Sequence, residues 1–334
     1  MSLRAAMLVP LSELQDGQEA DMFVLLTAKE TLTTRDGKPY FKVAFRDFQR
    51  EVAFPIWQDS PWAMECRDQW NPGTAYKLRA TYRETNYGPQ LEIRKIREVA
   101  PADEADGFDP HMFLPRSRFD APQMFDELLG IAKERIQEPR LRGLTIDLLE
   151  SNRGPLLSLP AATRNHHAFV GGYLEHVLSV TRTCVLLADK YADYYPDMRP
   201  PLNKDLAVAG GILHDIGKVR EYRELPTGAE YTAAGTLIGH ILQGRDMVRE
   251  AGNRHEVDAE TLLRLEHIIV SHQRLPEWGS PKPPMTPEAL LVHYADDLDA
   301  KMNMMFTALR DDTAAGPLTS NKNMLYQKVY RGGE

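Results

Sequence analysis

Apolar and polar residues alternate with a period of two over much of the first hundred residues, a pattern typical of strands that bury one face. Polar turns containing glycine, asparagine or proline interrupt this alternation. We therefore expect five strands, over residues 21–31, 40–46, 51–57, 75–83 and 90–99. Five short strands of this kind predict a small antiparallel β-barrel formed by residues 1–100.

The pattern changes to a helical period from Pro122 onward, where apolar residues recur at i, i+3 and i+4. The predicted helices cover residues 122–138, 139–151, 167–194, 204–214, 237–252, 258–272 and 286–310. Residues 101–121 are acidic and contain prolines, so we interpret them as a linker. The expected architecture is α+β and multidomain, with an all-α domain at 122–315 and a weakly patterned tail at 316–334.

Charge and cysteine content narrow the class of protein. The net charge is −8, and residues 1–100 hold equal numbers of acidic and basic side chains, so the rest of the chain carries the negative charge. Such a chain does not coat nucleic acid through a polycationic surface. Cys66 and Cys184 lie far apart and match no zinc-binding spacing, which fits a reducing compartment.

The sequence also indicates where the protein acts. No segment contains the roughly 18 unbroken apolar residues of a membrane-spanning helix. The first residues lack the long apolar stretch of a secretion signal. We therefore expect a cytoplasmic protein without a membrane partner.

The strongest chemical signal is the adjacent pair His214 and Asp215, at a helix end marked by Gly217. A carboxylate has two oxygens, so Asp215 can bridge two cations while His214 holds one of them. Taken alone, the pair is equally compatible with a salt bridge at a helix end.

Other ionisable residues lie on the apolar faces of separate predicted helices. They are His176, His240, His272 and Asp296. Burying such groups is costly unless they meet and share a cation, so they predict one metal centre between helices. Mixed nitrogen and oxygen ligands favour Mn²⁺, with Mg²⁺, Fe²⁺ and Co²⁺ as alternatives, and one or two ions per chain.

Two further histidines compete for roles near this centre. His267 precedes His272 by five residues, about 140° around a helix, so both cannot easily face one metal. We expect His272 to be the ligand and His267 to be a partly buried or surface histidine. His293 lies three residues before Asp296 and either hydrogen-bonds a ligand carboxylate or serves helix packing.

The order of these residues resembles that of the HD-domain phosphohydrolases, which bind one or two divalent cations. Several stretches are similar to the YhaM-type 3′–5′ exoribonucleases: HH at 166–167, GGYLEH at 171–176, GILHDIGK at 211–218, EWGSP at 277–281 and DDLDAK at 296–301. An OB-like barrel before an HD domain is also their arrangement. The resemblance implies metal ligation by His176, His214, Asp215, His240, His272 and Asp296. One departure is Gln273, where these enzymes usually carry a second histidine.

Three residues near the predicted metal centre are candidates for catalysis beside Asp215. Lys218 follows the His-Asp pair by one helical turn and can reach a metal-bound phosphate, although a surface position is equally compatible. His166 and His167 either donate to phosphate or cap the following helix. Lys301 and Arg164 are weaker candidates for the same contact.

The barrel offers a candidate surface for nucleic acid. Tyr40, Lys42 and Arg46 share one face of a predicted strand, and Trp57 on the next strand extends it. Aromatic side chains among cations suit single-stranded nucleic acid, with Lys77, Arg79 and Arg83 as possible additions. An ordinary solvated barrel face remains the alternative.

These features lead us to expect a metal-dependent hydrolase of phosphodiester bonds in a single-stranded nucleic acid. The resemblance implies that it is a 3′–5′ exoribonuclease, with single-stranded DNA as the alternative to RNA. One alternative is an HD phosphohydrolase of mononucleotides or cyclic nucleotides with a structural barrel. Another is a nucleic-acid-binding regulatory protein with a degenerate HD site. The sequence indicates no oligomeric state.

Overall fold

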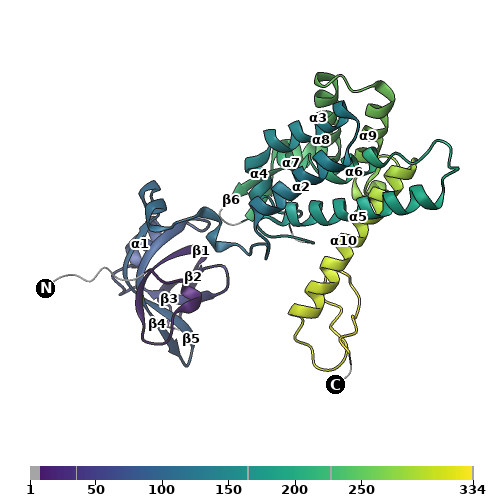
Figure 1. The fold of residues 1–334 in the computed structure, drawn as a ribbon. Helices are drawn as coiled ribbons and strands as arrows, with labels where there is room; N and C mark the ends of the chain where they lie inside the picture. Colours follow the sequence, from purple (N-terminus) through teal and green to yellow (C-terminus); the bar gives the residue numbers. More distant parts are fainter. Residues whose placement is uncertain (1–7, 35, 164, 226–227, 333–334) are drawn as a thin grey trace. The chain divides into compact units, whose positions relative to one another are not determined.

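The computed structural model describes residues 8–34, 36–163, 165–225 and 228–332, which form two compact units (Figure 1). The first unit reaches Pro115 and the second begins at Arg116. The short segment Leu225–Gly228 is grouped with the first unit. None of the described helices combines the length and the apolar character needed to cross a bilayer.

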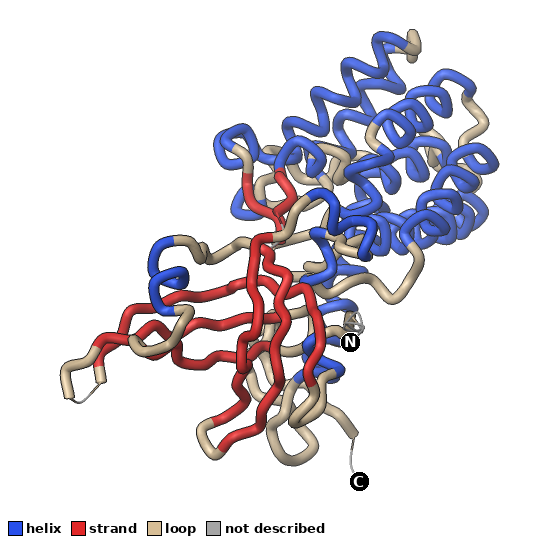
Figure 2. The backbone as a smooth tube through the Cα atoms, turned by 90° about the vertical axis from the view of Figure 1, so that its left-hand side faces the viewer, coloured by secondary structure: helices blue, strands red, loops and turns tan. Residues whose placement is uncertain are grey.

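The first unit is built on a five-stranded antiparallel sheet with the order β3-β2-β1-β4-β5 (Figure 2, red). Its strands are β1 (Glu19–Thr33), β2 (Pro39–Arg46), β3 (Glu51–Trp57), β4 (Ala75–Thr85) and β5 (Gly88–Glu98). The edge strands β3 and β5 approach within 8 Å, so the sheet curls into a barrel. All five predicted strands are confirmed. Helix α1 (Ala63–Asp68), between β3 and β4, was not predicted because six residues are too few to show a helical period.

The barrel interior follows from the alternation of the strands. Val43 and Phe45 of β2 are fully buried. The ring of Phe45 lies 5.9 Å from that of Trp70 and 6.2 Å from that of Tyr76, both edge-on. Aromatic pairs at such distances add stabilisation to the area they bury.

Residues after β5 pack on the outside of the barrel. They form two 3-10 helices, η2 (Pro101–Asp106) and η3 (Pro110–Phe113). The Phe108 ring lies 5.2 Å from that of Phe23 on β1, and Phe113 is fully buried. This part of the segment that we expected to be a linker therefore covers one outer face of the sheet.

The second unit is helical, as predicted. Its helices are α2 (Ala121–Arg135), α3 (Pro139–Ser151), α4 (Arg153–Ser158), α5 (Gly172–Tyr194), α6 (Lys204–Leu213), α7 (Lys218–Glu221), α8 (Ala233–Arg254), α9 (Ala259–Ser271) and α10 (Pro287–Asp311). One correction to the all-α expectation is the short hairpin of β6 (Tyr222–Leu225) and β7 (Gly228–Tyr231). Four-residue strands are too short to show alternation in the sequence.

Helix α6 forms the centre of this unit, with every residue from Leu206 to Leu213 buried. Two consecutive glycines let neighbouring helices approach closely. A Cβ on Gly210 would lie 2.7 Å from Cγ2 of Ile268 on α9, and one on Gly211 would lie 3.1 Å from Sγ of Cys184 on α5. The end of α6 is thereby held between α5 and α9.

We predict that Gly210→Ala destabilises the helical unit by about 1–3 kcal/mol, because its methyl group overpacks the contact with Ile268. Gly130→Ala in α2 is the matched control, since its Cβ would meet no atom within 4 Å. That variant should gain roughly 0.5–1 kcal/mol from better helix propensity. The free energy of unfolding of each variant is measured by denaturant titration, with the helical circular dichroism signal as the probe. A more stable Gly210→Ala would contradict the close packing.

Candidate metal centre

The centre begins where α6 ends. The backbone N–H of His214 still donates to the Gly210 carbonyl at 2.8 Å, and the chain then turns tightly through Asp215 to Gly217. A Cβ on Gly217 would lie 1.9 Å from the His240 carbonyl oxygen, so this turn fits against α8 only with glycine. His214 and Asp215 are both buried.

Four imidazoles surround the Asp215 carboxylate. Oδ2 lies 3.7 Å from Nε2 of His176 and 3.5 Å from Nε2 of His214. Oδ1 lies 3.3 Å from Nε2 of His240 and 3.6 Å from Nε2 of His272. Each carboxylate oxygen therefore faces a different pair of histidines.

Asp296 of α10 completes the first half of the centre. Its Oδ1 lies 3.2 Å from Nε2 of His176 and 3.9 Å from Nε2 of His214. The first half thus consists of His176, His214 and Asp296 with a shared Asp215, and the second half of His240 and His272 with the same Asp215. The structure brings together all six residues that the sequence predicted as metal ligands.

Two of the histidines are oriented by the helix ends on which they lie. His214 and His272 follow the last residues of α6 and α9, and their Nδ1 atoms donate to the Gly211 and Ile269 carbonyls at 2.9 and 2.7 Å. These carbonyls belong to the last helical turn, where partners within the helix run out. With Nδ1 carrying the proton, Nε2 of each neutral ring presents a lone pair to the centre.

The donor atoms fit a divalent cation. Asp215 Oδ1 and His272 Nε2 are buried and have no hydrogen-bond partner among the residues that the structure describes. These two atoms lie 3.6 Å apart. Buried acceptors that face one another without a donor cost free energy. Two groups here, His176-His214-Asp215 and Asp215-His240-His272, have ligand atoms within 4.8 Å of one another and could each hold an ion.

The electrostatics of the centre also favour positive charge. Burial lowers the pKa of His214 to about 4. Burial acts in the same direction on His176 and His240, but adjacent carboxylates reverse it and raise the pKa values to about 9 and about 8. Burial would raise the pKa of Asp215, yet Lys218 and His214 hold it well below its usual range. The buried carboxylates therefore stay ionised and stabilise cationic charge among the imidazoles.

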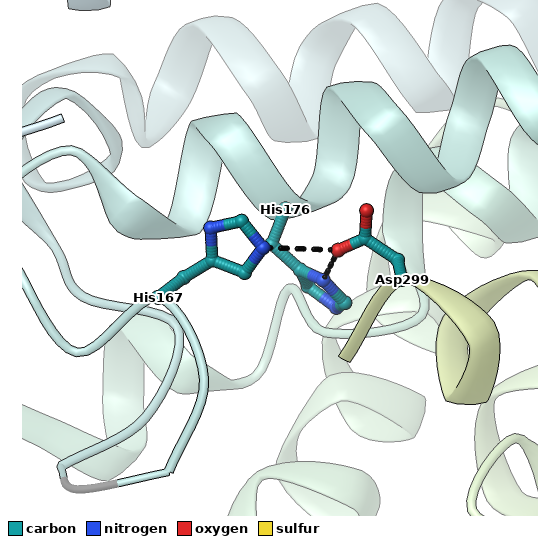
Figure 3. A group of neighbouring side chains, drawn as sticks. All are labelled: His167, His176 and Asp299. Carbon is teal, nitrogen blue, oxygen red and sulfur yellow. Dashed lines mark hydrogen bonds and ion pairs between the residues drawn. The ribbon is translucent and has the colours of Figure 1, made fainter. Parts of the chain in front are cut away.

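Two carboxylates that the sequence did not single out support the histidines: Glu221 is buried and Asp299 is partly buried. Glu221 Oε1 accepts from the backbone N–H of His240 at 2.8 Å and from its Nδ1 at 3.0 Å. Asp299 Oδ2 accepts from Nδ1 of His176 at 2.7 Å (Figure 3). Asp299 was predictable, because it lies three residues after Asp296 and therefore on the same face of the helix. Glu221 was not predictable, because it meets His240 through a kink in α8 at Gly239 (φ 78°).

The candidate phosphate-binding residues lie in different environments. Lys218 is buried, with Nζ donating to Asp215 Oδ2 at 2.6 Å and to the Ala161 carbonyl. His167 donates from Nε2 to Asp299 at 3.1 Å. His166 keeps a buried Nδ1 without a partner among the described residues, and its ring centre lies 5.1 Å from that of His176. Lys301 pairs with Asp297, and Arg164 lies outside the described residues.

The structure also gives the contacts of Gln273 and of the two histidines that competed for roles near the centre. His267 Nε2 accepts from the backbone N–H of Met285 at 2.8 Å. His293 Nδ1 donates to the His272 carbonyl at 2.7 Å, so it supports the backbone of a candidate ligand rather than a carboxylate. Nε2 of Gln273 lies 3.4 Å from Nε2 of His240, at the edge of the second half.

On the barrel, Tyr40 and Trp57 are cross-strand neighbours whose ring centres lie 4.9 Å apart. Trp57 is 49% exposed, and Lys42 is exposed on the same face. Arg46 instead donates to the Phe113 carbonyl at 3.1 Å. The other cations that we considered are paired: Lys77 with Asp103 and Asp106, Arg79 with Asp21, and Arg83 with Glu92.

Comparison with known protein families gives a match that lies in the helical unit. A family model for the HD domain matches residues 173–301, which include all six candidate ligands. This match supports a metal-dependent phosphohydrolase domain that binds divalent metal ions.

The barrel has weaker likenesses among solved structures. A crystal structure of a domain of replication protein A from Methanococcus maripaludis is 10% identical, with 28% of this chain and 96% of that chain covered and a TM-score of 0.23. The solution structure of the second OB-fold domain of that protein is 13% identical, with 28% and 95% covered and a TM-score of 0.22. The role of the barrel is argued from its own residues below.

We predict that His272→Ala weakens Mn²⁺ binding by more than the roughly 10- to 100-fold typical of losing an outer-sphere partner, because its Nε2 faces Asp215. His267→Ala, five residues away and directed at Met285, should leave the affinity unchanged. Calorimetric titration of the metal-free chains measures both. Greater loss in His267→Ala would mean that the wrong histidine of this helix has been assigned to the centre.

Proposed function

We propose that the chain hydrolyses phosphodiester bonds in single-stranded RNA from the 3′ end, with one or two divalent cations in the helical unit. The observation that carries this proposal is the Asp215 carboxylate, whose two oxygens face two separate pairs of imidazoles at 3.3 to 3.7 Å. A buried carboxylate shared between two sets of donors suits the adjacent cations of phosphoryl-transfer sites.

The chain's own residues would prepare this site for the reaction. Bound divalent cations lower the pKa of water and offset negative charge on phosphate oxygens. Lys218 holds the Asp215 carboxylate in place, and the carbonyls of Gly211 and Ile269 orient two imidazoles toward it. Such fixed groups need little reorganisation during the reaction, which is the main source of electrostatic catalysis.

His166 is the best candidate for contact with the substrate. Its buried Nδ1 has no partner among the described residues, whereas His167 is committed to Asp299 and Lys218 to Asp215. A free imidazole nitrogen beside His176 can donate to a phosphate oxygen held at the centre. We therefore assign phosphate binding to His166 before His167 or Lys218. Mn²⁺ is our proposed ion, because the donors mix imidazole and carboxylate.

The barrel would hold the strand by stacking. Tyr40 is partly exposed and Trp57 is exposed, and their rings form a pair with the Lys42 ammonium on the same face. Stacking of a base on an aromatic side chain contributes roughly 1–3 kcal/mol and tolerates any base. Arg46 contributes less, since it already holds the Phe113 carbonyl. The preference for RNA and the strand polarity rest on the resemblance to YhaM-type enzymes.

A second candidate is a phosphohydrolase of mononucleotides or cyclic nucleotides with a structural barrel. The paired state of Lys77, Arg79 and Arg83 favours it, because these ion pairs leave few barrel cations free for a phosphate backbone. A degenerate, purely binding HD site fits less well, because all six candidate ligands converge.

The test is incubation of the metal-free chain with Mn²⁺ and 5′-labelled single-stranded RNA. We expect stepwise shortening from the 3′ end and at least a 100-fold loss in Asp215→Asn, which keeps the shape of the side chain but loses its charge (about 100-fold corresponds to 2.7 kcal/mol). Turnover of mononucleotides or cyclic nucleotides with intact RNA would support the second candidate. Tight RNA binding without hydrolysis of any substrate would support a binding protein.

We also predict that replacing Tyr40 and Trp57 together by Ala slows RNA hydrolysis at low RNA concentration by about 10- to 100-fold, as expected for the loss of one or two stacked bases. Hydrolysis of bis-para-nitrophenyl phosphate should be unchanged, since the ester needs no strand contact. The matched control is Phe48→Ala, which removes an aromatic ring that is 45% exposed at the other end of the β2–β3 hairpin. Equal losses for both substrates would show that the barrel acts only on stability.

A further inference from the structure

A cluster of His167, His176 and Asp299 lies beside the first half of the metal centre (Figure 3). We infer that Asp299 is a positioning residue, which fixes the proton and the ring orientation of His176 so that His176 can bind a cation. The inference rests on the proposed function, because it assigns His176 to the metal. It adds a residue that acts through a ligand rather than on the substrate.

The hydrogen bonds of Asp299 determine where the protons lie. Its Oδ2 is 2.7 Å from Nδ1 of His176 and 3.1 Å from Nε2 of His167. An ionised carboxylate can only accept, so both of these nitrogens carry a hydrogen. In a neutral His176 ring, Nε2 is then the lone-pair atom, and it faces Asp296 Oδ1 at 3.2 Å.

The surroundings of His167 agree with this assignment. Its backbone N–H donates to Asn303 Oδ1 at 3.0 Å, and Asn303 Nδ2 lies 3.4 Å from its Nδ1. The amide thus donates to Nδ1 and leaves the ring hydrogen on Nε2, directed at Asp299. Asn303 and Asp299 are one turn apart on α10, so a single helix face holds both ends of this chain of hydrogen bonds.

The backbone holds His167 tightly in this arrangement. Its φ angle of 46° lies in the left-handed region, which a non-glycine residue adopts only where its surroundings hold it. A Cβ on Gly172 would lie 2.0 Å from the His167 carbonyl oxygen, so only glycine at the start of α5 admits the loop. The loop before α5 is therefore fitted to bring its imidazole to Asp299.

The same cluster is less suited to a third cation. Both ring nitrogens of His167 and Nδ1 of His176 have hydrogen-bond partners, unlike Asp215 Oδ1 and His272 Nε2. His176 would also have to lose both ring protons to serve one cation on each nitrogen. A chain of hydrogen bonds from Asn303 through His167 and Asp299 to His176 explains these contacts without the loss of both ring protons.

The second half of the centre repeats the arrangement. Glu221 supports His240 through Nδ1, as Asp299 supports His176. Each half therefore contains one imidazole held by a carboxylate and one held by a backbone carbonyl. A carboxylate partner raises the basicity of a ligating imidazole and fixes its orientation.

The test compares Asp299→Asn with Asp297→Asn in the full chain. Asp297 lies two residues away on the same helix and pairs with Lys301 at 2.7 Å, so it offers the same chemistry away from the cluster. In calorimetric titrations with Mn²⁺ alone, Asp299→Asn should bind about 10- to 100-fold more weakly and Asp297→Asn should match the unsubstituted chain. His167→Asn, whose side chain is too short to donate to Asp299 and which tolerates a positive φ, should give a smaller loss and serves if Asp299→Asn does not fold.

Nuclear magnetic resonance provides a readout that a purely structural role would not move. In the Mg²⁺-loaded, ¹⁵N-histidine-labelled chain, the Nδ1 proton of His176 should appear far downfield and move upfield in Asp299→Asn alone. Unchanged Mn²⁺ affinity in Asp299→Asn, or an equal loss in Asp297→Asn, would overturn this inference while leaving the proposed function intact. If the unsubstituted chain binds no metal, the proposed function fails and this inference fails with it.

Discussion

The helical unit depends on the burial of one carboxylate, that of Asp215. An ionised carboxylate in a protein interior is stable only where positive charge and hydrogen-bond donors meet it. Lys218 meets one oxygen, while the other has no hydrogen-bond partner among the described residues and lies 3.3 and 3.6 Å from two imidazole nitrogens. Helices from distant parts of the chain must converge on this point. The glycines of α6 and Gly217 allow that convergence, because any side chain there would hold the neighbouring helices apart.

The ends of helices determine how the centre is built. His214 and His272 each follow the last residue of a helix, and each satisfies a carbonyl of the last turn with Nδ1. The same hydrogen bond ends the helix and points the Nε2 lone pair inward. His176 lies within a helix and His240 follows a kink, so neither has a terminal carbonyl to bind. The carboxylates of Asp299 and Glu221 orient them instead. The position of each histidine relative to a helix end thus explains which kind of partner orients it.

Much of the fold and of the candidate site was predictable from the sequence, because the signals lie within single strands and helices. The five strands and the seven longer helices follow from periodicity, and the six candidate ligands stand out as ionisable residues on apolar faces. Short elements such as α1 and the β6–β7 hairpin contain too few residues to show a period. Glu221 was missed because its contact with His240 needs both that hairpin and the positive φ angle of Gly239. The different surroundings of the His166 and His167 side chains were also hidden, because they follow from the left-handed backbone of His167.

The barrel shows why charge counted along a sequence does not predict a binding surface. Lys77 and Arg79 lie opposite Arg97 and Lys95 on the neighbouring strand, and such like-charged pairs are unfavourable by themselves. Asp21, Asp103 and Asp106 offset them, so these cations stabilise the barrel and its following 3-10 helix. The rings of Tyr40 and Trp57, by contrast, contact each other at the surface of the barrel. A strand bound there would gain most of its affinity from stacking and release few counterions, so its binding would depend only weakly on salt.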